Sequence, residues 1–77
     1  MIDLFQINDL VMFYTKQYVG LKIETLYNAR DCKFRVIIKS GKNEWSKSIT
    51  CFTTYGAYKF LNDIVIEFLA KGCYCNG

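Results

Sequence analysis

The residues that most restrict the fold of this chain form the stretch CKFRVIIKSGKNEWSKSITC, positions 32–51. Apolar and polar residues alternate through both halves of this stretch, which predicts a β-hairpin with Gly41 and Lys42 as its turn residues. A register shift of one residue would turn every apolar side chain to the other face, so we expect a single register. In that register the facing apolar pairs are Ile38 with Trp45, Phe34 with Ile49, and Cys32 with Cys51.

One pair does not fit this pattern, because Val36 would face Lys47 on the apolar side of the hairpin. Two arrangements would let the lysine reach water: a β-bulge at Lys47, or a place for its strand at the edge of the sheet. The sequence is compatible with either arrangement.

The N-terminal part of the chain predicts a helix over residues 9–18. Asn8 is a good N-cap residue, and Ile7 and Met12 have the spacing of a hydrophobic staple around such a cap. Residues 1–6 either extend this helix backwards or form an extended arm.

Two further elements follow from periodicity and cap residues. Residues 21–27 alternate between apolar and polar side chains, which indicates a half-buried strand ending in a turn. Residues 54–71 have a helical pattern that begins at Thr53 or Thr54 and ends at Gly72.

The apolar stripe of the helix at 54–71 is broad enough to cover a sheet. Tyr55 and Ile66 are expected on the opposite, exposed side of this helix, beside Asn62. The stripe consists of Thr54, Ala57, Tyr58, Leu61, Ile64, Val65, Phe68 and Leu69.

Taken in order, these elements predict an α+β fold, a two-layer αβββα domain whose three-stranded antiparallel sheet carries both helices on one face. We expect residues 1–77 to form this single small domain, with 73–77 as a flexible tail. The other face of the sheet would be open to solvent. Its side chains would be Lys22, Glu24, Leu26, Lys33, Arg35, Ile37, Lys39, Glu44, Ser46, Ser48 and Thr50.

The chain lacks the residues that several classes of function usually require. The chain has no histidine, its four cysteines form no C-x-x-C pair, and no glycine-rich phosphate-binding motif occurs. We therefore expect no enzyme activity, no metal ion and no cofactor. No apolar run is long enough to cross a membrane, and Asp3 stands where a signal peptide would carry a basic residue, so we expect a cytoplasmic protein without membrane contact.

Positive charge is concentrated in the hairpin. Residues 30–47 contain six basic and two acidic residues, a net charge of +4, whereas the rest of the chain sums to −1. The basic face could bind phosphates of a nucleic acid, bind an acidic protein surface, or be ordinary solvated surface with a cross-strand ion pair between Lys39 and Glu44. The candidate partner-binding residues are Lys33, Arg35, Ile37, Lys39, Lys42, Tyr55 and Ile66.

Two families have a similar order of elements. The αβββα order resembles double-stranded-RNA-binding domains, whose second helix begins with a lysine cluster, but the corresponding segment TTYGAYKF contains Lys59 alone. INDLVMFYTKQY, VGLKIETL, the hairpin and the helix at 54–71 together resemble small phage-encoded anti-CRISPR proteins, among which one type II inhibitor also begins with an I-N-D-L helix. A composition rich in Lys, Asn, Ile and Tyr and free of proline suits an AT-rich genome, as many phages have.

The anti-CRISPR resemblance implies a non-enzymatic inhibitor in the host cytoplasm. Such a protein would bind a host defence protein or ribonucleoprotein and block its nucleic-acid loading or its activity. These inhibitors often present acidic side chains that mimic DNA, whereas the distinctive surface here is basic, so no functional residue carries over. The alternative is a small nucleic-acid-binding domain that uses the basic sheet face. A third alternative is a toxin–antitoxin or regulatory module that acts as a dimer through Tyr55 and Ile66, so the chain would be a monomer or a homodimer.

Overall fold

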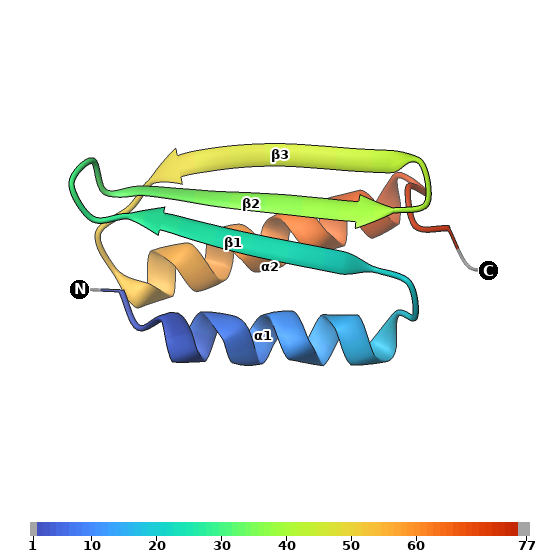
Figure 1. Ribbon diagram of the computed structural model, residues 1–77, viewed down its shortest axis with the longest axis horizontal. Coiled ribbons are helices and arrows are strands. Elements are labelled where there is room, and N and C mark those ends of the chain that lie inside the picture. The colour runs from blue at the N-terminus through green and yellow to red at the C-terminus, as the bar shows by residue number, and fades with distance from the viewer. Residues whose placement is uncertain (1, 76–77) are drawn as a thin grey trace.

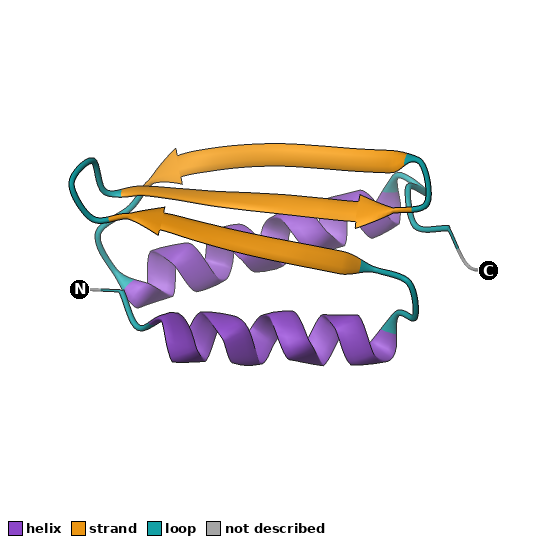
Figure 2. Cartoon of the chain, viewed as in Figure 1, coloured by secondary structure: helices purple, strands orange, loops and turns teal. Residues whose placement is uncertain are grey.

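The computed structural model describes residues 2–75 and confirms the predicted αβββα fold. The three strands form one antiparallel sheet in the order β1-β2-β3, and both helices pack against the same face of it (Figures 1 and 2). Neither helix in this part of the chain is long and apolar enough to span a bilayer. The elements are α1 (Leu4–Gln17), β1 (Lys22–Asn28), β2 (Lys33–Ser40), β3 (Asn43–Thr50) and α2 (Thr54–Ala70).

The register of the β2–β3 hairpin is the predicted one. Ile38 pairs with Trp45 and Phe34 with Ile49, and the backbone N–H of Cys51 donates to the carbonyl of Cys32 at 2.9 Å. Gly41 has a φ of +60°, which the first central residue of a type II′ turn requires and which glycine adopts without strain.

Lys47 faces Val36 without a bulge, because β3 is an edge strand of the sheet. The edge position is therefore the arrangement that the structure adopts. From there the Lys47 ammonium group lies 4.9 Å from the centre of the Trp45 ring, a favourable cation–π distance. An inward-pointing lysine also discourages edge-to-edge pairing of β3 with another strand.

Helix α1 begins earlier than predicted. Its N-cap is Asp3, whose carboxylate accepts the backbone N–H of Phe5 at 3.0 Å, whereas Asn8 lies exposed within the helix. The prediction of a cap at Asn8 is thus wrong, and residues from Leu4 onward extend the helix backwards. The predicted staple does not form either, since Ile7 is fully buried in the core and Met12 is exposed.

The core lies between the sheet and the two helices. The N-cap of helix α2 is Thr53, one of the two predicted alternatives. The Oγ1 of Thr53 accepts a hydrogen bond from the backbone N–H of Gly56. The predicted stripe supplies Ala57, Leu61, Ile64, Val65 and Phe68 to the core. These side chains pack against Phe34, Val36 and Ile38 of the central strand and against Ile7, Leu10, Val11 and Tyr14 of α1.

Asn62 was expected on the exposed side of α2, but it faces α1. The Tyr14 hydroxyl donates a hydrogen bond to its side-chain oxygen, which joins the two helices. Helices α1 and α2 run in parallel from neighbouring starts, where the N–H of Asp3 donates to Thr54 Oγ1 at 2.8 Å (Figure 1).

Residues 73–75 pack against the end of the hairpin. The N–H of Cys75 donates to the buried Ser40 hydroxyl at 2.7 Å, and the Tyr74 hydroxyl donates to the carbonyl of Val19 at 2.6 Å. We call residues 73–75 the C-terminal strap, because they tie the end of α2 to the β2–β3 turn and to the α1–β1 connection. Of the predicted flexible tail at 73–77, residues 76–77 lie outside the described residues.

Candidate functional site

The open face of the sheet brings together most of the predicted partner-binding residues. Lys33, Arg35, Ile37 and Lys39 follow one another along the central strand β2, each about 6.6–6.8 Å from the next. Lys42 is exposed in the adjoining turn. Across the three strands the outward side chains form the rows Asn28–Lys33–Thr50, Leu26–Arg35–Ser48, Glu24–Ile37–Ser46 and Lys22–Lys39–Glu44.

The basic side chains of this face differ in whether they form an ion pair within the sheet. Lys39 forms the predicted ion pair with Glu44, with 3.6 Å between Nζ and Oε1, and both side chains are about half exposed. Arg35 stands between Leu26 and Ser48, and Lys33 between Asn28 and Thr50, so neither has a carboxylate directly across from it. Lys33 and Arg35 therefore make no cross-strand ion pair, and neither does Lys22, whose cross-strand partner is Lys39.

The apolar part of the open face lies next to these cations. Ile37 is half-buried at the centre of the sheet, and Leu26 is exposed beside Arg35. Two shallow hollows flank them, one of about 160 Å³ between Lys22 and Lys39 and one of about 310 Å³ beside Lys33 and Arg35. Ile37 lies between Arg35 and Lys39 along β2 and between Glu24 and Ser46 across the strands, so it is a small apolar centre within a mixed, mainly basic face.

No aromatic ring lies on the open face of the three strands. Trp45 points inward as predicted, where its ring meets that of Phe68 edge-on at 5.2 Å between centroids. Phe34 is fully buried. Proteins that bind single-stranded nucleic acids without sequence preference rely on exposed aromatic rings for base stacking, and this face does not offer them.

Tyr55 and Ile66, the remaining predicted partner-binding residues, lie on α2 and not on the open sheet face. Their side chains are 75% and 52% exposed. By helical spacing they flank Tyr58 and Asn62, which line a groove between the two helices. The structure therefore divides the predicted residues between two surfaces, the basic sheet face and this groove.

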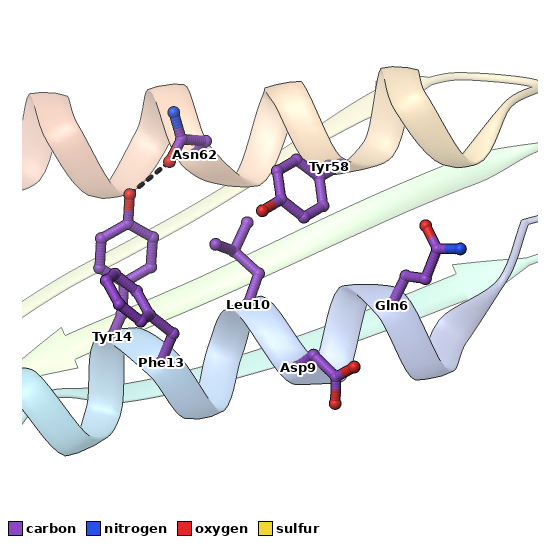
Figure 3. A pocket seen from close by; sticks show the side chains of 7 residues that line it. All are labelled: Gln6, Asp9, Leu10, Phe13, Tyr14, Tyr58 and Asn62. Atoms are coloured by element: carbon purple, nitrogen blue, oxygen red, sulfur yellow. Dashed lines mark hydrogen bonds between the residues drawn. The ribbon is translucent and has the colours of Figure 1, made fainter.

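The α1–α2 groove has a volume of about 480 Å³, within the range of small-ligand sites. The sequence pattern did not predict a site at the residues that line it. The feature that could have indicated one is the presence of Phe13 and Tyr58 at the margins of the apolar stripes of α1 and α2, where their rings stay partly exposed. The lining residues, shown in Figure 3, are Gln6, Asp9, Leu10, Phe13, Tyr14, Tyr58 and Asn62.

The Tyr14–Asn62 hydrogen bond forms one wall of the groove (Figure 3). Burial raises the pKa of the Tyr14 phenol above its ordinary value of 10.0, and the neighbouring Tyr58 and Tyr18 raise it further. The phenol therefore stays protonated at neutral pH and remains a hydrogen-bond donor to Asn62.

The four cysteines carry free thiols. Burial raises the pKa of the Cys51 thiol, and the nearby Cys32 adds to the effect, so Cys51 is a poor nucleophile at neutral pH. Cys32 takes a left-handed φ of 54°, which is uncommon for a residue with a side chain. Within residues 2–75, no three His, Cys, Asp or Glu side chains gather as a metal site would require.

Comparisons with protein-family profiles, with curated proteins and with solved structures found no match to this chain.

Proposed function

We propose that this protein is a small non-enzymatic inhibitor of phage or mobile-element type, which binds a host defence protein or ribonucleoprotein through its open sheet face. The observation that supports this proposal is the composition of that face, where Ile37 lies between Arg35 and Lys39 along β2 and Lys33 lies beyond Arg35. In the cytoplasm of a host cell, such a protein would block the nucleic-acid loading or the activity of its target.

The mixture of charge and apolar surface favours a protein or ribonucleoprotein partner over naked nucleic acid. Protein interfaces combine an apolar core with a polar rim, and the charges at the rim control association rate and specificity. The open face has that arrangement on a small scale. It also carries Glu24 and Glu44, which would repel a phosphate backbone.

The second candidate function is direct binding of nucleic acid. The spread of Lys22, Lys33, Arg35 and Lys39 across the face favours it, because cations at several positions can each contact a phosphate. Such binding would weaken steeply with salt, by about 0.7–0.9 in log K per phosphate contact for each log unit of salt.

Charge reversal on the open face tests the proposal. The double variant Lys33→Glu/Arg35→Glu is compared with Lys16→Glu/Lys59→Glu, which changes the net charge equally but alters exposed residues of the helical layer. Both variants should keep the circular-dichroism spectrum of the wild type, because all four side chains are exposed. The assay is DNA cleavage by purified RNA-guided type II nucleases, each assembled with guide RNA.

We expect inhibition by the wild-type protein and by the control variant, and loss of inhibition in Lys33→Glu/Arg35→Glu. Full inhibition by that variant would contradict the assignment of the sheet face. Tight, salt-sensitive binding of the wild-type protein to random DNA or RNA, with no effect on the nucleases, would favour the second candidate function.

A further inference from the structure

The α1–α2 groove differs from the sheet face in charge and in chemistry. Asp9 is the one charged residue in its lining, which includes no lysine or arginine. Phe13 and Tyr58 present aromatic surface that is 58% and 41% exposed. The groove is therefore locally acidic and aromatic in a chain whose net charge is +3.

Two of the lining residues add neutral hydrogen-bond acceptors. The Gln6 amide lies along α1 near Asp9, and the Asn62 amide lies opposite on α2 (Figure 3). The oxygen of Asn62 accepts the Tyr14 hydroxyl and still has a second lone pair. The lining of this open space of about 480 Å³ thus includes a carboxylate at its α1 rim, two side-chain amides and aromatic rings.

This combination is complementary to a guanidinium group. A guanidinium is planar, always charged at neutral pH, and can stack on an aromatic face while its N–H groups donate to a carboxylate and to amide oxygens. A neutral apolar group would gain nothing from the exposed Asp9 carboxylate. A carboxylate or phosphate would be repelled by it.

We propose that the α1–α2 groove binds an arginine side chain of a partner polypeptide. Asp9 accepts the guanidinium N–H groups, and Phe13 and Tyr58 pack on its faces. Tyr55 and Ile66, which flank the groove along α2, contact the polypeptide on either side of the arginine. This site does not depend on the proposed use of the sheet face, because the groove lies on the helical layer.

The test uses the full chain, labelled for NMR, and titrates it with N-acetyl-L-arginine methylamide. The control ligand is the citrulline analogue, which has nearly the same shape but no charge. We expect saturable shifts with a millimolar dissociation constant at Asp9, Phe13, Tyr58 and Asn62, and binding of the citrulline analogue at least about tenfold weaker. Equal binding of the two ligands, or shifts centred on another carboxylate, would overturn the proposal.

Variants separate this site from the sheet face. Asp9→Asn should weaken arginine binding about tenfold, whereas Asp63→Asn, an exposed carboxylate of α2 outside the groove, should leave it unchanged. Lys33→Glu/Arg35→Glu should bind the arginine ligand as the wild type does. If Asp9→Asn binds as tightly as the wild type, the carboxylate is not the recognition element and the proposal fails.

Discussion

The side-chain amide of Asn43, the first residue of β3, donates a hydrogen bond of 2.7 Å to the backbone carbonyl of Cys73, 30 residues later in the chain. This bond closes the C-terminal strap over the β2–β3 turn. The fit is close, since a Cβ at Gly41 would come within 2.9 Å of the Cys75 sulfur. The strap is therefore part of the folded domain.

Removal of that bond should lower stability. In Asn43→Ala the partly buried carbonyl of Cys73 loses its side-chain donor, which should reduce the free energy of unfolding by about 1 kcal/mol. Urea denaturation measures the effect, with Ser46→Ala, an exposed residue of the same strand, as the control. An equal loss in both variants would mean that the Asn43–Cys73 hydrogen bond does not contribute to stability.

The centre of α2 should tolerate truncation poorly. Leu61 is fully buried, so Leu61→Ala should cost about 2–5 kcal/mol by leaving a cavity between the sheet and the helices. Ile66→Ala removes an apolar group from the same helix, but at a side chain that is half exposed, and should cost far less. Thermal melts of the two variants decide whether the buried face of α2 is assigned correctly.

The two cap residues of the N-terminal segment should behave differently. Asp3→Ala removes the acceptor for the Phe5 N–H and should cost about 1 kcal/mol. Asn8→Ala should be close to neutral or slightly stabilising, because Asn8 is exposed inside α1 and alanine has the higher helix propensity. Chemical denaturation of both variants checks this. A larger loss of unfolding free energy in Asn8→Ala than in Asp3→Ala would show that the start of α1 is assigned to the wrong residue.

Tyr14 should make stability depend on alkaline pH. Its pKa is raised by folding, so the unfolded chain loses this proton first, and the free energy of unfolding should fall as the pH rises above about 10. Below that pH the contribution is fully present. Tyr14→Phe should lower stability at pH 7 by about 1 kcal/mol, through loss of the hydrogen bond to Asn62, and should show a shallower decline above pH 10.

The matched control for Tyr14→Phe is Tyr55→Phe, because Tyr55 is largely exposed. We expect this variant to keep both the neutral-pH stability and the alkaline decline of the wild type. The measurement is urea denaturation at a series of pH values from 7 to 11. Identical profiles for wild type and Tyr14→Phe would contradict the role given to the buried phenol.

The sequence by itself determined the elements whose pattern is repeated and local. The two-residue alternation in the hairpin allowed one register, in which Phe34 meets Ile49 and Val36 meets Lys47, and the structure has that register. The helical spacing of α2 likewise predicted most of its buried face, because burial of a stripe follows from the 3.6-residue period. Tyr58 departs from the prediction, since the period places it in the stripe but its side chain is 41% exposed. The exposed positions of Lys33, Arg35 and Lys39 follow from the same alternation.

Tertiary structure decided what depends on the position of a distant segment. Asp3 and Asn8 are both suitable N-cap residues. The folded chain uses Asp3, whose backbone N–H also donates to Thr54, 51 residues away. Asn62 lies at the margin of the α2 stripe, so its environment depends on where α1 packs. The α1–α2 groove and the C-terminal strap likewise depend on tertiary structure, because each is formed by segments that come into contact only in the folded chain. Local periodicity carries no information about such contacts.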